Sequence, residues 1–296
     1  MWRILLLGLL GLIGLSSYGQ IKKHYTVENN NSFDRVAVTL SGGSGTCYIR
    51  PTPNNNPVNI YGTAESDVPG PSCESILEQR TQKVNVNFLD GKLNESSTKK
   101  VSFNVFGDTE SNRQNQWHVY LSKKKPVQLN LNYGMGNAFV DLSGLAVEKL
   151  NITTGSADVN IGYISGQYNQ QEMDTFCIKV DLGTLEARQV ALSNAKTIIA
   201  DVGFGSLHLD FTNKSLVSSN VNATVGAGNL VVNANESINP MIIYIQNSPL
   251  CRVKIPQSFT EIRENVFVSS QYDQDAENLI TFNIDVTMGN IIFKTF

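Results

Sequence analysis

Charge is scarce in this sequence. Charged residues make up 17% of it, and the formal net charge is only −3 at pH 7. The one basic triplet, Lys123–Lys125, precedes a proline and has no basic stripe or interleaved aromatic residues around it, although a nucleic-acid-binding surface has these features. Nucleic acid is therefore not expected as a partner, and we interpret the triplet as a solvated turn.

Long hydrophobic runs are also scarce. The one long run, Ile4–Leu15, follows a basic residue and precedes the small residues Ser17 and Gly19. A basic start, a short apolar core and a small-residue end are typical of a secretory signal peptide, and such a run is too short for a stable membrane anchor. We expect residues 1–19 to be a signal peptide, and the mature chain to reach the periplasm or cell surface without a transmembrane anchor.

Residues that bind metals or act as nucleophiles are few, with 4 cysteines and 3 histidines among 296 residues. No two cysteines have the C-x-x-C spacing of a zinc or redox motif. If a disulfide forms, we expect it to join Cys47 to Cys73. Residues 42–47 have the glycines of a calcium-binding β-roll, but Cys47 replaces the ligand aspartate. We expect no catalytic residues, no cofactor and no metal.

What the sequence does have is a repeat with a period of about twenty residues. In each copy a glycine is followed by Asn, Ser or Thr and then by an alternating apolar run. The glycines are Gly136, Gly155, Gly183, Gly205, Gly228 and Gly289. Positions three and five before each glycine, and two and four after it, are apolar in every copy. This alternation predicts two half-buried strands joined by a sharp corner in each copy.

Glycine at each corner has a conformational explanation, because only glycine reaches a positive φ without a steric penalty. We therefore predict a positive φ at these glycines. The Asn, Ser and Thr residues that follow them bond readily to turn backbone, and we expect them to form a polar ladder if the coils stack in register. The gap between Gly228 and Gly289 leaves room for two more coils, one of them aligned on Pro249.

The pattern predicts an all-β chain folded as a β-solenoid, with a β-sandwich as the alternative. A sandwich also has alternating strands between turns, but it does not require the same residue class at fixed offsets from each glycine. We expect a single solenoid domain over residues 20–296. Its N-terminal coils, 33–126, carry long loops, and the regular repeat covers 127–296.

Three further strands and three long loops are expected in the N-terminal coils. The strands are Val84–Phe88, Val101–Val105 and Trp117–Leu121, and the loops are Pro51–Pro57, Val68–Cys73 and Asp108–Asn115. Each of the strands alternates apolar and polar residues. The loops are rich in Pro, Asn, Ser, Gly and Asp, residues that favour turns.

Two stretches, Trp117–Ile161 and Asn283–Phe293, resemble the bacterial toast-rack or "putative adhesin" family. That family is related to the C-terminal domain of LiaF-type cell-envelope stress proteins. The resemblance covers residues 33–296 and implies a β-solenoid exported to the envelope, with no established enzymatic activity. The repeated motifs are structural, so no binding residue is transferred from the family.

The favoured function is that of a non-catalytic cell-envelope protein, an adhesin or an envelope-stress protein, which binds an envelope protein or a surface glycan. The alternative is a carbohydrate-active enzyme, a polysaccharide lyase or glycosidase, which would use carboxylates on one exposed face. Outward acids are expected at Asp141, Asp158, Glu186 and Asp210. They show no repeated pairing, which favours solvated strand faces. A cleft that holds two carboxylates about 5–10 Å apart would favour the enzyme.

Overall fold

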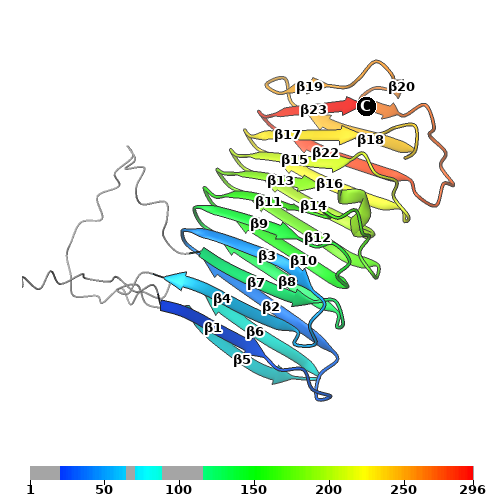
Figure 1. Ribbon diagram of the computed structural model, residues 1–296. Helices are drawn as coiled ribbons and strands as arrows, with labels where there is room; N and C mark the ends of the chain where they lie inside the picture. Colours follow the sequence, from blue (N-terminus) through cyan, green and yellow to red (C-terminus); the bar gives the residue numbers. More distant parts are fainter. Residues whose placement is uncertain (1–20, 65–70, 89–115, 296) are drawn as a thin grey trace, which may run out of the picture.

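The computed structural model describes residues 21–64, 71–88 and 116–295. These residues form two long β-sheets that face each other across the core (Figure 1). The predicted signal peptide, the predicted strand Val101–Val105 and the predicted loop Asp108–Asn115 lie outside the described residues. None of the described residues belongs to a helix long and apolar enough to cross a membrane.

Sheet A has 11 strands. In spatial order they are β1 (Ile21–Val27), β4 (Val58–Ala64), β7 (Gln116–Ser122), β3 (Thr46–Thr52), β9 (Asn137–Asp141), β11 (Asp158–Gly162), β13 (Thr184–Arg188), β15 (Ser206–Phe211), β17 (Asn229–Ala234), β23 (Asn290–Thr295) and β19 (Arg252–Lys254).

Sheet B has 12 strands. In spatial order they are β20 (Thr260–Arg263), β21 (Val266–Val268), β18 (Met241–Asn247), β22 (Ile280–Val286), β16 (Ser219–Val225), β14 (Ala195–Val202), β12 (Met173–Val180), β10 (Val147–Thr154), β8 (Val127–Tyr133), β2 (Arg35–Gly42), β6 (Thr81–Asn87) and β5 (Ser72–Glu78). A short 3-10 helix, η2 (Val190–Ser193), follows β13.

Each coil consists of one strand from sheet B and the next strand from sheet A, and neighbouring coils pair in parallel and in register. Val180, Val202, Val225 and Val286, for example, are successive partners across sheet B. This parallel stacking confirms the predicted β-solenoid, and the alternative of a β-sandwich is wrong. It also explains why the same residue class recurs at fixed offsets, because equivalent positions stack on one another.

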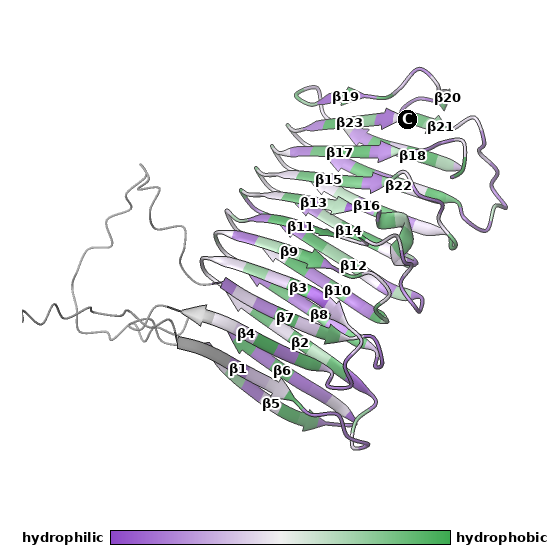
Figure 2. Cartoon of the chain, viewed as in Figure 1, coloured by the Kyte–Doolittle hydropathy of each residue, from purple (hydrophilic) through white to green (hydrophobic). Residues whose placement is uncertain are grey.

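The core lies between the two sheets and is built by alternation along each strand. In β16, buried and exposed residues alternate without exception, from Ser219 to Val225. Figure 2 shows hydrophobic and hydrophilic residues alternating along many of the strands. Stacked inward Val, Ile and Leu residues form one continuous cluster, and each fully buried side chain of this kind contributes about 1.5–3 kcal/mol relative to an exposed one.

Most corner positions require glycine for a reason other than the predicted positive φ. Gly136 has a φ of 88°, but the other five predicted corner glycines are not among the residues with a positive φ, so that prediction is wrong for them. A Cβ atom on Gly205 would lie 2.3 Å from the carbonyl oxygen of Gly183, and one on Gly228 would lie 2.3 Å from that of Gly205. Glycine is required there because the backbones of stacked coils approach too closely for a side chain.

The same carbonyl oxygens bind the neighbouring coil. The backbone N–H of Ser206 donates to Gly183 O at 3.0 Å, and that of Asn229 donates to Gly205 O at 2.9 Å. The predicted polar ladder is confirmed beside them. Asn229 Nδ2 donates to Ser206 Oγ at 3.1 Å, and Asn290 Nδ2 donates to Asn229 Oδ1 at 2.7 Å.

One predicted corner is displaced by two residues. Asp158 pairs with Asn137, so Ala157, and not Gly155, is equivalent to Gly136. Side chains alternate with a period of two along a strand, so a shift of two residues leaves the inward face unchanged. The apolar pattern therefore could not reveal the displacement.

The coils do not follow chain order at the two ends of the stack. The last strands, β22 and β23, pair with β16 and β17 on one side and with β18 and β19 on the other. The chain between Gly228 and Gly289 forms one of the two predicted coils, β18 and β19, around Pro249. The second predicted coil is wrong, because the strands that follow, β20 and β21, pair antiparallel. At the other end, β2 and β3 lie between β8 and β9 on one side and β6 and β7 on the other.

Antiparallel strands complete both ends. β21 and β20 follow β18, while β5 follows β6, and β4 and β1 follow β7. The predicted strands at 84–88 and 117–121 correspond to β6 and β7. Two predicted loops are shorter than expected, because Pro51 and Thr52 belong to β3, and Ser72 and Cys73 to β5.

The lysine triplet forms the predicted turn between β7 and β8, but it is not simply solvated. Lys125 Nζ donates to the carbonyl oxygens of Phe33 at 2.6 Å and Asn30 at 2.8 Å, and it lies 3.8 Å from the centre of the Phe33 ring. The triplet thus fastens the turn to the segment before β2.

Candidate functional site

The outer face of sheet A carries a row of aromatic side chains across five adjacent strands. They are cross-strand partners in the order His24, Tyr61, His118, Tyr48 and Phe139. Alternation places them outward, because their chain neighbours, such as Ile49, Ile60 and Val119, are buried in the core. We call this set the aromatic row.

Most neighbouring rings in the aromatic row stack face to face. The ring centroids of His24 and Tyr61 are 4.4 Å apart, those of Tyr48 and His118 are 4.9 Å apart, and those of Tyr48 and Phe139 are 5.3 Å apart, with interplanar angles of 8°, 11° and 15°. The spacing between strands, about 4.8 Å, places partner rings at stacking distance. Each such pair adds about 0.5–1.5 kcal/mol beyond the burial of its area.

The stacking is interrupted between β4 and β7. Tyr61 there meets Tyr120 edge-on, with ring centroids 5.8 Å apart and planes at 77°. Beside this pair lies a hollow of about 400 Å³. Its lining residues are Thr52, Asn54, Asn59, Tyr61, His118 and Tyr120. We call this space the aromatic hollow.

The lining of the aromatic hollow is uncharged at neutral pH. Burial lowers the pKa of His118, and the nearby Arg50 lowers it further. Its Nδ1 atom is buried and has no hydrogen-bond partner among the described residues. The remaining lining groups are phenols, amides and a hydroxyl, which both donate and accept hydrogen bonds.

The Asn59 side chain and the loop that carries Asn54 are held by contacts with their neighbours. Asn59 is buried, and its Oδ1 accepts a hydrogen bond from Thr26 Oγ1 at 3.1 Å. The carbonyl oxygen of Asn54 accepts one from Ser122 Oγ at 2.7 Å, and Lys124 Nζ donates to Asn55 Oδ1. The loop between β3 and β4 is therefore fixed against the β7–β8 turn.

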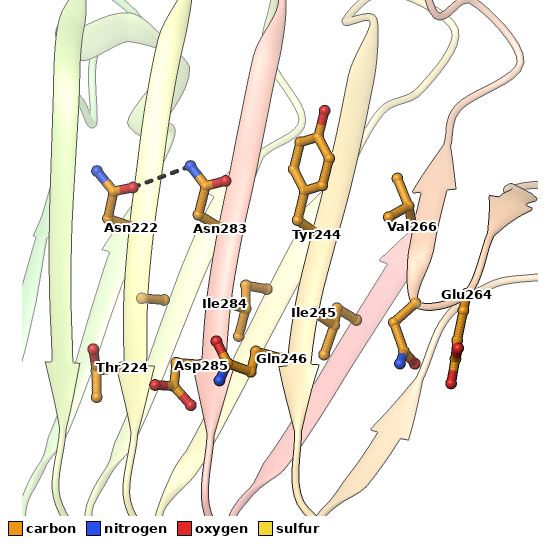
Figure 3. Close-up of a pocket in the computed structure, with 12 residues that line it drawn as sticks. Asn222, Thr224, Tyr244, Ile245, Gln246, Glu264, Val266, Asn283, Ile284 and Asp285 are labelled. Carbon is orange, nitrogen blue, oxygen red and sulfur yellow. Dashed lines mark hydrogen bonds between the residues drawn. The ribbon is translucent and has the colours of Figure 1, made fainter.

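A second hollow, of about 460 Å³, lies over β16, β22 and β18 on sheet B. Figure 3 shows Asn222 and Asn283 side by side, joined by a hydrogen bond of 3.1 Å, with Tyr244 on the next strand. Glu264 and Asp285 also line this hollow, so it is polar and acidic, in contrast to the aromatic hollow.

A third hollow, of about 480 Å³, lies on sheet A beyond the aromatic row and holds Asp158, Glu186 and His208. It is the place where two of the predicted outward carboxylates come together. Glu186 forms an ion pair with Arg188 at 2.6 Å, and Asp158 is exposed. One carboxylate is therefore paired with a cation, and the other faces solvent.

The other two predicted outward acids form turns. Asp141 Oδ1 accepts a hydrogen bond from the backbone N–H of Ser143 at 2.9 Å, and Asp210 Oδ1 accepts one from that of Thr212 at 2.9 Å. Both carboxylates thus close the bend that follows a sheet-A strand. They have a local structural role and do not face each other as a catalytic pair.

The thiols are not arranged for chemistry. All four cysteines are free, so the disulfide suggested between Cys47 and Cys73 is not formed. Burial raises the pKa of Cys47 to about 12 and that of Cys73 to about 11, which leaves both as unreactive thiols. Among the described residues, no group of three or more His, Cys, Asp or Glu side chains is placed to hold a metal ion.

Large apolar side chains are also exposed at the corners. They are Met135, Leu182, Phe204 and Met288, and each precedes a corner glycine. Phe204 is 72% exposed. Each of these side chains comes from a different coil, and only Leu182 and Phe204 belong to adjacent coils.

The family model for the N-terminal domain of toast_rack, DUF2154, matches residues 16–184, which is more than half of the chain. The chain belongs to the toast-rack family. The match includes the whole aromatic row and the first regular coils. No curated protein matches the sequence.

Solved structures similar to this toast-rack protein include two bacterial proteins. A "putative cell adhesion protein" from Clostridium sporogenes ATCC 15579 is 17% identical, with a TM-score of 0.45, and the match covers 94% of this chain and 100% of that one. A "putative adhesin" from Parabacteroides merdae ATCC 43184 is 10% identical, with a TM-score of 0.34, and the match covers 93% and 94% of the two chains.

Proposed function

We propose that this toast-rack protein is an exported, non-catalytic protein of the periplasm or cell surface, which binds an envelope protein or a surface glycan through the outer face of sheet A. The aromatic row is the observation that carries the proposal. Tyr61 is 43% exposed and Phe139 is 40% exposed. Contiguous apolar patches on a soluble surface are uncommon and mark interaction sites.

The position of the aromatic row supports binding rather than stability as its purpose. Further along the same outward line, the successive cross-strand partners after Phe139 are Asn160, Glu186, His208, Val231 and Ile292. Polar and aliphatic residues therefore occupy equivalent positions in the solenoid, and the run of adjacent rings ends at Phe139. The aromatic residues gather instead on the adjacent strands β1, β4, β7, β3 and β9, beside the one uncharged hollow among the three described above.

The alternative of a carbohydrate-active enzyme has weaker support. Its specific requirement is a pair of carboxylates facing a substrate cleft. The third hollow contains two carboxylates, but one is paired with Arg188 and the other is exposed. Family membership and the predicted signal peptide accord with an exported binding protein.

The test measures binding of the purified, exported protein to immobilised bacterial envelope fractions. The variant Tyr48→Ser/Phe139→Ser removes two rings of the aromatic row, and we expect at least a tenfold loss of binding. The matched control, Phe204→Ser, removes an exposed corner ring and is expected to bind as the wild type does. Equal binding by all three proteins, or release of sugars from the fractions by the wild type, would contradict the proposal.

A further inference from the structure

The three hollows described above differ in charge. Glu264 and Asp285 line the hollow on sheet B, and Asp158 and Glu186 line the third hollow. Among the residues that the structure describes, no carboxylate, lysine or arginine lines the aromatic hollow. A ligand with a net charge would therefore find no opposite charge within the aromatic hollow itself.

Two cations lie next to residues that line the aromatic hollow. Arg50 is the cross-strand partner of Tyr120 and its guanidinium lies 5.2 Å from the centre of the Tyr48 ring, and Lys124 Nζ donates to Asn55. Neither side chain lines the hollow. Phosphate or carboxylate recognition usually uses an arginine or lysine that forms charge-assisted hydrogen bonds within the site, so the lining favours an uncharged ligand.

The walls of the aromatic hollow offer two kinds of surface. The rings of Tyr61 and Tyr120 stand at 77° to each other, so they form two walls that meet in a corner, and His118 adds a third ring. Aromatic rings favour contact with apolar C–H groups. Beside these rings, the hydroxyl of Thr52 and the amides of Asn54 and Asn59 line the same space and provide both donors and acceptors.

This combination matches one class of ligand. A sugar ring has an apolar C–H face, which suits a tyrosine ring, and a rim of hydroxyl groups, which suits amides. The volume of about 400 Å³ falls at the lower end of the range for small-ligand sites, about 300–1,000 Å³. We propose that the aromatic hollow binds a neutral sugar ring of a glycan, an inference that rests on the proposed binding function.

The structure also explains how such a site is kept in shape. Tyr61 is backed by His24 on one side at 4.4 Å, and His118 is backed by Tyr48 at 4.9 Å. The aromatic row therefore supports the two rings that flank the hollow. Rigid aromatic walls lower the entropy lost on binding.

The experiment titrates the purified, exported protein with chitotetraose, cellotetraose and mannotetraose as neutral probes, and with tetragalacturonic acid as an anionic one. Calorimetry gives affinity, and saturation-transfer NMR reports direct contact. We expect at least one neutral probe to bind, and to bind at least tenfold more tightly than the anionic probe. Tyr61→Ala and Tyr120→Ala are expected to weaken that binding at least tenfold.

Matched variants separate the site from general effects. Tyr244→Ala, in the hollow on sheet B, and Phe204→Ala, at a corner, are expected to leave affinity within about twofold of the wild type. Asn54 lies on an exposed loop, so Asn54→Ala is expected to fold and to weaken binding of the sugar. It replaces a tyrosine variant in the test if that variant does not fold. Thermal melting of each variant checks folding.

Three results would overturn the assignment: no binding of any neutral probe, tighter binding of the anionic probe, or unchanged affinity in folded variants of Tyr61, Tyr120 and Asn54. If envelope fractions still bind through Tyr48 and Phe139 while no sugar probe binds, the proposed function stands and the sugar assignment falls. If the fractions do not bind, the proposed function fails as well.

Discussion

At the scale of single residues, the corner glycines show that glycine can be required because the backbone of a neighbouring coil lies too close for a side chain, and not only because its own φ is positive. At Gly205 the carbonyl oxygen of the coil below occupies the space of a side chain, and it does so because it accepts a hydrogen bond from Ser206. A methyl group would have to push two coils apart or break that bond. The backbone has little freedom to do either.

We therefore predict that Gly205→Ala destabilises the protein by about 1–3 kcal/mol, the usual cost of overpacking. The measurement is the urea dependence of unfolding. Gly134→Ala is the matched control: Gly134 also lies at a corner, but its added Cβ would be 3.5 Å from the nearest atom, an ordinary contact. Equal losses in both variants would show that close approach between coils is not the cause.

At the scale of strands, three aromatic side chains join the last coil to both sheets. The ring centroid of Phe282 on β22 lies 5.5 Å from that of Phe211 on β15 and 5.2 Å from that of Phe293 on β23, and the ring planes in both pairs are nearly perpendicular. Phe282 is fully buried. The packing of this cluster therefore fixes β22 across the core as well as along sheet B.

Phe282→Ala is expected to lower the free energy of unfolding by about 3–5 kcal/mol, the range for a large aromatic side chain lost from a packed core. Thr281→Ala, the adjacent outward residue on β22, is the control and is expected to cost well under 1 kcal/mol. Denaturant unfolding of both variants gives the comparison. A similar small loss in each would mean that the cluster does not hold the strand.

Strands and their inward residues were predictable from the sequence, but strand order was not. Alternation marks Val180, Val202 and Val225 as core residues whichever coils they stack on. Because alternation repeats every two residues, it fits a corner at Gly155 as well as one at Ala157, and the prediction chose the wrong one. Nor could alternation show that β22 lies between β16 and β18. Pairing partners depend on contacts between distant segments, and many partners have a compatible pattern.

The aromatic row escaped prediction for the same reason. Its members are His24, Tyr48, Tyr61, His118 and Phe139, and their strands are adjacent in an order that differs from the order in the chain. Each strand alone shows only one or two outward aromatic residues, which is ordinary. Only the order β1, β4, β7, β3, β9 turns five such residues into a surface.

At the scale of the whole molecule, the first and last coils are enclosed by other coils. Deletion of residues 280–296 would remove a coil from inside the stack and expose the edges of β16, β17, β18 and β19, which promote aggregation when unpaired. We predict loss of the cooperative thermal transition and of solubility. Deletion of β1, an outermost strand, is the control and is expected to leave a cooperative transition; a normal melt after the first deletion would contradict the prediction.

Enclosure of the last coil also has a mechanical consequence. A tension applied at residue 295 runs along β23, which is bonded to β17 on one edge and to β19 on the other. The strand cannot be unzipped bond by bond from a free edge, so the load falls in shear on two hydrogen-bonded ladders at once. Forced unfolding is governed by the unfolding rate rather than by equilibrium stability. A solenoid enclosed in this way is expected to resist being unravelled by a pull on its last strand.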